Sequence, residues 1–508
     1  MAFLDRAANR GSISTGYDID YSVLIDGQHS DGEISQTGGD RKTHTISFWH
    51  KRAPRHHAIH DAAGGPEMTT NDLWGTPSEG DTLRFNTSQL GFFRNGESAG
   101  SLYTTRRFRD YSAWYHFVIA VDTTQSTASN RIKMYINGIQ ETDFSIENYP
   151  SQNSETKLMQ NGQTFYIGAG HGGNTQYGAQ GYYADFYIID GAAKAASDFG
   201  EFDSDSGIWK PKEYTGDFNV GSGTNGAHYK FEGTAEGNSS GSATGRDTSG
   251  NSNHMNFENQ QGGMLDTPTN NFCMLNMNDA TASGAYRPDL MKGCLSYEPS
   301  GSGSSTIRGT FGMSRGKWYW ECKLATTGGQ NFGVCTANMN IPTTSSQEGG
   351  FIINSSNGDA EFFSIYAASH YRSYHVYDGT NWNSAAAWSD ITNFSAGDIF
   401  GFAFDRDNLD IYFSKNGSWT GVLTNQDPEG DPGSNTPFVY HAAINTQEDT
   451  IFMPVFSNSY NQDLHVNFGN PTHSISSGNA DANGYGNFEY PVPSGYYALC
   501  TKNLAEFG

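Results

Sequence analysis

The sequence predicts an all-β protein made of two β-sandwich domains joined by a short irregular connector. Two distant segments, Trp114–Phe144 and Gly401–Gly417, follow the same plan: an apolar strand, a polar turn, an alternating strand and an Asn-Gly pair. Because Asn and Gly both tolerate positive φ, each pair favours a two-residue hairpin turn. Glycine contributes 61 of 508 residues, which favours many turns and few helices. We expect only short helices, near Ala192–Phe199 and at Pro288–Met291.

The Trp114–Phe144 segment predicts three consecutive strands. Trp114–Val121 is a continuous apolar and aromatic run, as in a strand buried on both faces. Arg131–Ile136 alternates, with its Ile and Met side chains on one face. The chain is then expected to turn at Asn137-Gly138 and return through Gln140–Phe144.

The second half repeats this kind of pattern with larger aromatic side chains. Lys317–Leu324 alternates strictly, so that Trp318, Trp320, Cys322 and Leu324 share one face. Further short apolar segments follow at close spacing, and Gly, Asn, Asp or Ser bounds most of them. Many short strands separated by such turns are typical of a sandwich or a barrel.

Composition narrows the classes of partner. The chain has 30 Lys and Arg against 54 Asp and Glu, a net charge of −24, which argues against a nucleic-acid partner. Its five cysteines are odd in number and none has C-x-x-C spacing, so neither a disulfide framework nor a zinc site is implied. Met1–Tyr21 is polar and lacks the apolar core of a signal peptide, and no apolar run approaches the roughly 18 residues of a membrane span. We expect a protein made in a cytoplasm that does not insert into membranes.

The predicted domain organisation has four parts. We expect an N-terminal arm over residues 1–16, a first sandwich over 17–212, a connector with short strands over 213–292 and a second sandwich over 293–508. The first boundary is placed where the chain becomes polar and reaches Pro211. The connector is assigned because it is rich in Gly, Ser and Asp and contains only isolated short strands.

Several sequence words resemble known families. In the first half they are SVLIDG (Ser22–Gly27), RKTHTISFWHKR (Arg41–Arg52), FYIGAG (Phe165–Gly170) and YYADFYIIDG (Tyr182–Gly191). These resemble the laminin-G-like, concanavalin A-like jelly roll. In the second half, GKWYWECKL (Gly316–Leu324), GDIFGFAFDRDNLDIYFSKNGSW (Gly397–Trp419) and PSGYYAL (Pro493–Leu499) resemble a SPRY domain.

A further resemblance is to large virion proteins of tailed bacteriophages, many of them marine. It is carried by RDYSAWYHFVIAVDTTQSTASNRIKMYINGIQ (Arg109–Gln140), FGEFDSDSGIWKPKEYTG (Phe199–Gly216) and LDTPTN (Leu265–Asn270). Laminin-G-like domains imply carbohydrate or protein ligands, sometimes with Ca²⁺, and SPRY domains imply recognition of peptides or proteins by loops. Together these resemblances imply a virion protein whose role is binding.

We therefore expect a non-enzymatic virion structural protein, a tail-fibre or receptor-binding adhesin that contacts a glycan or protein on the host surface. Its other expected partners are further virion proteins and copies of itself, with a trimer as the expected oligomer. One alternative is a capsid or tail decoration protein that stabilises the particle. Another is a glycan depolymerase.

Two polar, aromatic loops are candidate ligand sites. Aromatic rings stack on the apolar face of a pyranose, while amide and carboxylate groups bond its hydroxyls. The alternative is that each aromatic packs back onto its own sheet, as surface apolar residues commonly do. The candidate residues are His171, Asn174, Gln176 and Tyr177 in the first half, and Tyr377, Asp378, Asn381, Trp382 and Trp388 in the second.

Catalytic and metal-binding patterns are weaker. Glu201, Asp203 and Asp205 alternate, as do the paired carboxylates of jelly-roll glycan hydrolases, but nearby Gly and Pro favour a turn or a helix cap. No cofactor is predicted, and Ca²⁺ remains an open alternative because several loop aspartates offer hard oxygen ligands. Four clustered histidines fit no familiar metal spacing. The aspartates are Asp26, Asp31, Asp122 and Asp185, and the histidines are His50, His56, His57 and His60.

Overall fold

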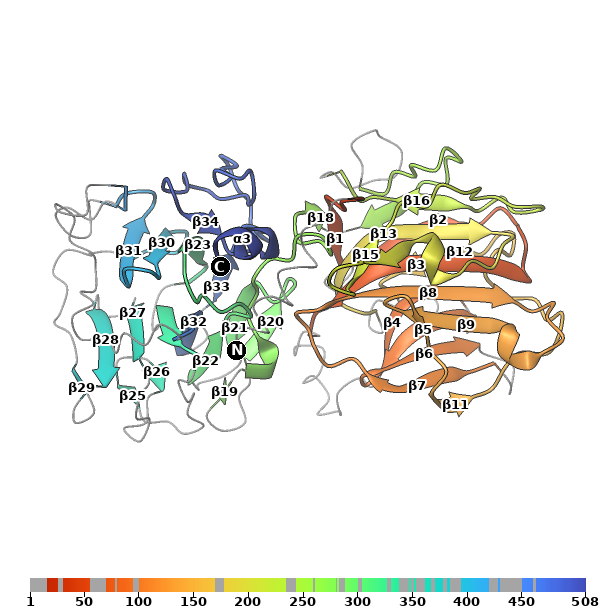
Figure 1. Cartoon of the computed structure of the whole chain (residues 1–508), viewed down its shortest axis with the longest axis horizontal. Coiled ribbons are helices and arrows are strands. Elements are labelled where there is room, and N and C mark those ends of the chain that lie inside the picture. The colour runs from red at the N-terminus through yellow and green to blue at the C-terminus, as the bar shows by residue number, and fades with distance from the viewer. Residues whose placement is uncertain are drawn as a thin grey trace. The chain divides into compact units, whose positions relative to one another are not determined.

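The chain forms two compact units, Met1–Asn271 and Phe272–Gly508, each built almost entirely of antiparallel strands (Figure 1). The predicted fold class, two β-sandwiches, is confirmed. The computed structural model describes residues 16–25, 31–54, 70–77, 80–94, 100–169, 178–233, 244–258, 261–279, 281–282, 288–299, 304–326, 330–337, 347–348, 351–352, 361–366, 371–377, 382–383, 394–419, 428–429, 450–459 and 463–508.

Two sheets face each other in the first unit. One has the order β10 (Ile139–Gln140), β9 (Ile132–Ile136), β8 (Trp114–Asp122), β3 (Thr43–Arg52), β13 (Gly181–Asp190), β1 (Ser22–Ile25) and β18 (Gln261–Met264), with β16 (Ala227–Tyr229) also paired to β13. The other has the order β11 (Phe144–Glu147), β7 (Leu102–Arg107), β6 (Gln89–Arg94), β5 (Asp81–Asn86), β4 (Thr70–Gly75), β12 (Thr164–Ile167), β2 (Asp31–Ser35) and β17 (Asn256–Glu258).

Aromatic side chains from both sheets fill the space between them. Phe117 of β8 meets Phe85 of β5 edge-on at 6.2 Å, and Phe186 of β13 meets Phe165 of β12 at 6.1 Å. Their positions follow from the alternation of the strands, which sends every second side chain into the core. This core fixes the positions of the strand ends.

The outer face of the β3 sheet is also buried. The chain after β13 crosses it through the 3₁₀ turn η3 (Ala196–Asp198) and the hairpin of β14 (Gly200–Phe202) and β15 (Trp209–Pro211). Trp209 donates a hydrogen bond from Nε1 to Nδ1 of His116 (3.1 Å), whose Nε2 lies 2.9 Å from Oγ of Ser47. Much of the stretch expected as a connector belongs to the first unit, where it supplies β16, β17 and β18, while residues 272–292 lie in the second unit.

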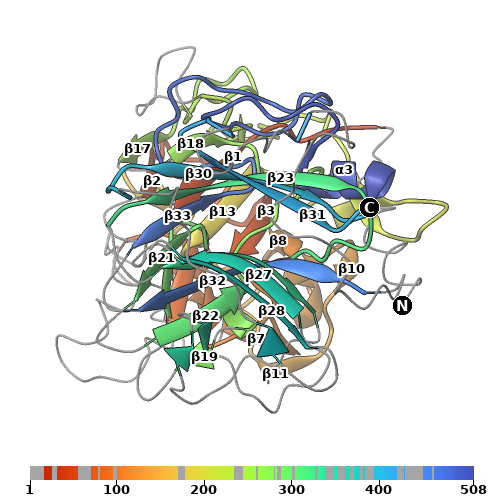
Figure 2. The same ribbon diagram turned by 90° about the vertical axis from the view of Figure 1, so that its left-hand side faces the viewer.

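The second unit is a two-layered sandwich as well, as Figure 2 shows from its end. Aromatic rings join the layers: Phe402 stacks on Trp320 of its own sheet at 5.3 Å and meets Phe332 of the other sheet edge-on at 5.5 Å. One layer has the order β19 (Thr281–Ala282), β22 (Ser304–Arg308), β32 (Phe452–Ser459), β24 (Asn331–Thr336), β27 (Glu361–Tyr366), β28 (Tyr371–Tyr377) and β29 (Trp382–Asn383). The other has β20 (Pro288–Met291), β21 (Ser296–Pro299), β33 (Leu464–Asn467), β23 (Lys317–Leu324), β30 (Ile399–Asp405) and β31 (Asp410–Lys415), with β34 (Tyr497–Ala498) parallel to β23.

Several local predictions are confirmed. Both Asn-Gly pairs adopt positive φ, with 48° and 81° at Asn137 and Gly138 and 49° and 76° at Asn416 and Gly417. Each Asn-Gly pair comes directly after a predicted alternating strand, β9 in the first unit and β31 in the second. The four side chains expected on one face of β23 are all buried. The remaining small elements are the 3₁₀ turns η1 (Ala128–Asn130) and η4 (Met277–Asp279) and the strand pair β25 (Gln347–Glu348) and β26 (Phe351–Ile352).

Two local predictions are wrong, and one element was missed. Pro288–Met291 is strand β20 and not a helix, because Ser296–Pro299 supplies a pairing partner. The return strand after Gly138 ends at Gln140, and Phe144 already belongs to β11 in the opposite sheet. A helix at the end of the chain, α3 (Thr501–Phe507), was not predicted because it has no apolar repeat long enough to mark it.

Candidate binding surface at the loop end of the first unit

Alternate connections of the first sandwich leave from the same end. The end of β3 at Arg52 and the end of β1 at Ile25 both pair with the start of β13 at Gly181. In the other sheet, the end of β5 at Asn86 pairs with the start of β4 at Thr70. We call this the loop end, because the connections that follow β1, β3, β5, β7 and β12 all begin here.

Arg52 bridges the two sheets at the loop end. Its side chain comes from β3, and its guanidinium donates one hydrogen bond to the carbonyl of Phe108 and another to that of Thr87 (3.3 Å). The guanidinium carbon lies 4.2 Å from the ring centre of Phe85 and 5.4 Å from that of Tyr111. Arg52 is only 7% exposed, and this burial lowers the pKa of its guanidinium.

Arg52 has no carboxylate partner within the part of the chain that the structure describes. The charged or titratable groups that influence its pKa are the phenols of Tyr111 and Tyr115. Burying a charge without an opposite charge is costly, and here backbone carbonyls and aromatic faces offset only part of that cost. The loop end therefore contains a positive charge that would gain from an arriving acceptor.

His50 lies two residues before Arg52 on the same face of β3. It was expected in a loop cluster with His56, His57 and His60, but it is a fully buried strand residue 4.5 Å from the ring of Tyr183, and the other three lie outside the described residues. Neither of its ring nitrogens makes a hydrogen bond of normal geometry. Burial, assisted by the charge of Arg52, lowers the pKa of His50 to about 3, so the imidazole is neutral near pH 7.

The stretch from the end of β7 to the start of β8 supplies the outer part of this surface. Tyr115 is half-buried and meets Phe108 edge-on at 5.1 Å, while Tyr111 is half-buried above Arg52. Burial raises the pKa of Tyr115, and the carboxylate of Asp110 raises it further. Arg106, Arg107 and Arg109 are exposed in the same stretch, which makes it rich in guanidinium and phenol groups.

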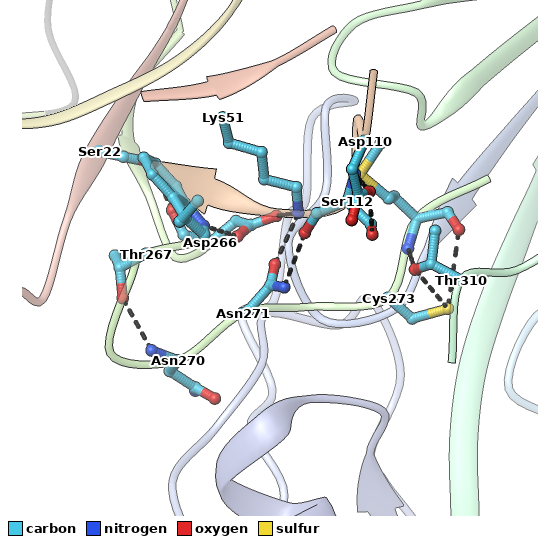
Figure 3. A network of polar contacts seen from close by, with 12 residues as sticks. Ser22, Lys51, Asp110, Ser112, Asp266, Thr267, Asn270, Asn271, Cys273 and Thr310 are labelled. Atoms are coloured by element: carbon cyan, nitrogen blue, oxygen red, sulfur yellow. Dashed lines mark hydrogen bonds and ion pairs between the residues drawn. The ribbon is translucent and has the colours of Figure 1, made fainter. Parts of the chain in front are cut away.

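A buried polar network on the other face of β3 holds this stretch in place (Figure 3). Nζ of Lys51 lies 2.6 Å from Oδ2 of Asp266 and 2.7 Å from Oδ1 of Asn271. Asn271 in turn donates to the carbonyl of Ser112 (3.0 Å), and Nε1 of Trp114 donates to Oδ1 of Asp266 (2.9 Å). Because Ser112 lies in the connection from β7 to β8 and Trp114 begins β8, the network restrains the backbone next to Tyr111.

Turn hydrogen bonds add to this rigidity. The carboxylate of Asp110 accepts hydrogen bonds from both the backbone N–H (2.8 Å) and the hydroxyl (2.6 Å) of Ser112. Such a turn restricts the backbone without using the aromatic side chains. The surface is thus preorganised, which lowers the entropic cost of binding a ligand.

Most of the predicted ligand residues cannot be placed. His171, Asn174, Gln176 and Tyr177 lie outside the described residues, but the strands on either side, β12 and β13, bring that connection to the loop end. In the second unit, Tyr377 of β28 and Trp382 of β29 are paired residues of adjacent strands. Asp378, Asn381 and Trp388 lie outside the described residues, so these sites stay predictions.

The three alternating carboxylates form a turn. Asp203 accepts hydrogen bonds from the backbone N–H groups of Asp205 (3.1 Å) and Ser206 (2.9 Å) and from the Ser206 hydroxyl (2.9 Å). The hydrogen bonds from Ser206 lower the pKa of Asp203. Nζ of Lys210 lies 3.3 Å from Glu201 and 3.6 Å from Asp203. An ionised carboxylate that caps a turn and shares an ammonium is poorly suited to act as a general acid, so the turn alternative fits better.

The candidate calcium ligands do not converge among the residues that are described. Asp122 ends β8 and accepts from Thr124 and Gln125, whereas Asp185 lies within β13 and accepts from Tyr17 (2.9 Å). Asp31 belongs to β2 in the other sheet, and Asp26 lies outside the described residues. In the described part of the chain, no three His, Cys, Asp or Glu side chains are arranged to hold a metal ion.

Sequence reasoning missed the arginine and tyrosine residues of the loop end. Arg52 was considered only as the last residue of Arg41–Arg52, a segment that resembles the laminin-G-like jelly roll. Tyr111 and Tyr115 were considered as part of Arg109–Gln140, the segment that resembles virion proteins. The available signal was local: three arginines in four residues, 106–109, within an acidic chain, followed closely by two tyrosines. Such a combination is a recognisable indication of a binding surface.

One family model matches part of the first unit. Residues 26–197 match the family model of the concanavalin A-like lectin/glucanases superfamily. No curated protein matches the chain. None of the described helices is both long and apolar enough to span a membrane.

Solved structures with a similar fold include the following three. Mouse laminin α1 domains LG4-5 cover 95% of this chain and 96% of their own, with 10% identity and a TM-score of 0.30. The SPRY domain of human HERC1 covers 39% of this chain and 99% of its own, with 14% identity and a TM-score of 0.24. A putative carbohydrate-binding protein from Bacteroides ovatus covers 50% and 62%, with 14% identity and a TM-score of 0.30.

Proposed function

We propose that this chain is a non-enzymatic binding protein that recognises carbohydrate through the loop end of its first unit. The observation that carries the proposal is the preorganised surface of Tyr111, Tyr115 and Arg52. It lies within the part of the chain that matches the concanavalin A-like superfamily. Phenol rings offer stacking faces for pyranose rings, and guanidinium groups donate to sugar oxygens.

The finer proposal is that the protein is a component of a tailed-phage virion, a tail-fibre or receptor-binding adhesin. It is supported by the resemblance of Arg109–Gln140 and Phe199–Gly216 to phage virion proteins. In that setting its partners are host surface glycan or protein, other virion proteins and copies of itself. Many copies on one particle convert weak single-site binding into firm attachment through effective concentration.

A homotrimer is the proposed assembly. Light scattering on the purified chain tests it: a mass of three chains is expected, and a mass of one chain at high concentration contradicts it. Capsid or tail decoration remains the second candidate, favoured by the resemblance to virion proteins alone. A depolymerase is disfavoured because Glu201 and Asp203 share the ammonium of Lys210 at a turn.

Adsorption to bacterial cells tests the proposal. The purified full-length chain is mixed with candidate host cells, with and without periodate oxidation of their surface, and its competition with phage adsorption is measured. We expect binding and competition that are lost after periodate treatment, because periodate cleaves sugar diols. Binding unaffected by periodate would contradict recognition of carbohydrate.

A matched pair of variants locates the site. Tyr111→Ala removes a half-buried ring at the loop end, while Tyr149→Ala removes a half-buried ring from the connection between β11 and β12 at the opposite end. We expect Tyr111→Ala to weaken binding by about tenfold, since one stacked ring contributes on the order of 1 kcal/mol or slightly more. Equal effects of the two variants would contradict the loop end as the site.

A further inference from the structure

We propose that the loop end selects sugars that carry a carboxylate, and that Arg52 is the residue that pairs with it. The inference rests on the proposed carbohydrate-binding function and adds the chemical class of the ligand. It depends on three features of the described residues: a buried cation without a counter-ion, a local excess of arginine, and a rigid aromatic frame.

Among the described residues of the first unit, the absence of a counter-ion at Arg52 is exceptional. Arg94 and Arg84 are the two other largely buried arginines described there, and each pairs with an aspartate. Nε of Arg94 lies 2.8 Å from Asp81, and Nε of Arg84 lies 3.0 Å from Asp72. Arg52 is as buried as Arg94, yet only carbonyl oxygens accept from it among the described residues.

A ligand carboxylate would fill this role. A guanidinium has five N–H donors, and the carbonyls of Phe108 and Thr87 use two of them. Carboxylates accept two parallel hydrogen bonds from a guanidinium, an arrangement that is stronger than a hydrogen bond to a neutral hydroxyl. The gain is larger in a buried setting, where water screens the charges less.

The aromatic frame indicates the side from which the ligand arrives. Phe85 and Phe108 are fully buried around Arg52, whereas Tyr111 is half-exposed. Tyr111 is thus the half-exposed neighbour of the buried guanidinium, and the ligand is placed beside it, where a sugar ring can stack on the phenol while its carboxylate reaches Arg52. His50 on the inner side is neutral near pH 7 and does not add charge.

The surrounding charge favours an anion locally despite the net charge of −24. Arg106, Arg107 and Arg109 are exposed beside this surface. Nε of Arg106 lies 3.8 Å from Oε2 of Glu141, which is a long separation for an ion pair. The carboxylate of Asp110 accepts a hydrogen bond from the hydroxyl of Ser112. The acidic remainder of the chain repels anionic ligands, so such ligands are expected to bind mainly at the loop end.

The experiment compares a sugar acid with its neutral ester on the full-length protein. Binding of an oligogalacturonate and of the same oligosaccharide as its methyl ester is measured by titration calorimetry. We expect the acid to bind at least about tenfold more tightly, the difference made by one charge-assisted hydrogen-bonded pair. Equal affinities would overturn the inference and leave the proposed function standing.

Variants identify the residue. Arg52→Gln should abolish the preference for the acid, and Arg52→Lys should retain only part of it, since lysine keeps the charge but loses the planar fork. Lys157→Gln removes the same charge from an exposed position at the opposite end and should change nothing. A preference for the acid that persists in a folded Arg52→Gln protein would overturn the assignment to Arg52.

Two further comparisons cover an unfolded variant and non-specific attraction of anions. If Arg52→Gln fails to fold, the comparison of acid and ester on the wild-type chain still decides whether carboxylates are selected. A dextran sulfate oligosaccharide of equal charge that binds as tightly as the acid would replace carboxylate selection with general anion attraction, and would overturn the inference. Failure of both acid and ester to bind, together with periodate-insensitive adsorption to cells, would overturn the proposed function as well.

Discussion

Lys51 and Arg52 are consecutive residues of β3 that carry buried positive charges on opposite faces of one sheet. Nζ of Lys51 lies 2.6 Å from Oδ2 of Asp266, and both side chains are almost completely buried. Arg52 has only backbone carbonyls and aromatic rings around it among the described residues. One charge is satisfied within the chain and holds the surface together, whereas the other remains available to a ligand.

The Lys51–Asp266 pair predicts a large effect on stability. Lys51→Met leaves the carboxylate of Asp266 buried without its partner, and we expect a loss of about 3–5 kcal/mol in the free energy of unfolding. Urea denaturation measures it. The control is Arg41→Met, which breaks an exposed pair with Glu155 (2.6 Å) and should cost at most about 1 kcal/mol. Similar losses in the two variants would contradict the structural role of the network.

Buried histidines predict acid sensitivity. Burial lowers the pKa of His50 and of His116 to about 3, from an ordinary value of 6.5. Below pH 6.5 these two histidines therefore bind protons in the unfolded chain but stay unprotonated in the folded chain. Stability is complete above that pH and falls as the pH drops toward 3. Each histidine should contribute a loss of about 2 kcal/mol at pH 5 relative to pH 7.

His50→Phe tests this dependence at one site. Neither ring nitrogen of His50 makes a hydrogen bond of normal geometry, so the variant should retain its stability at pH 7. Urea unfolding at pH 7 and pH 5 should show that the variant loses about 2 kcal/mol less than the wild type between these values. An unchanged pH dependence would show that His50 accepts a proton in the folded protein.

Gly138 predicts a packing requirement at the first hairpin. It has a φ of 81°, and a Cβ atom there would lie 2.2 Å from the indole of Trp209. Gly138→Ala should therefore lower stability by about 2–4 kcal/mol, through backbone strain and overpacking together. Gly162→Ala is the matched control, since its φ is 75° but nothing lies within 4 Å, and it should cost only about 1 kcal/mol. Thermal unfolding of the two variants compares them, and equal losses would exclude the contact with Trp209.

Metal removal should leave binding unchanged. The carboxylates of Asp122 and Asp185 are already engaged by side chains of the first unit. Adsorption to cells measured before and after EDTA treatment is expected to be the same. A loss that added Ca²⁺ restores would show that a calcium site forms part of the binding surface.

The strands could be predicted from the sequence, but the surroundings of Arg52 could not. Alternation in Lys317–Leu324 identified β23 because its period is a property of the strand itself. Pro288–Met291 was misread because its strand character depends on pairing with Ser296–Pro299. Arg52 owes its environment to Thr87, Phe108 and Tyr111, which come from other strands and loops, so local sequence carries little information about it.

A glycan array probed with the purified full-length chain tests the central claim most directly. The wild type is compared with a loop-end double variant, Arg52→Gln with Tyr111→Ala, and with an opposite-end double variant, Lys157→Gln with Tyr149→Ala. The account predicts binding that is strongest for carboxylate-bearing glycans, lost in the loop-end variant and kept in the opposite-end variant. Glycan binding that survives in a folded loop-end variant would contradict it.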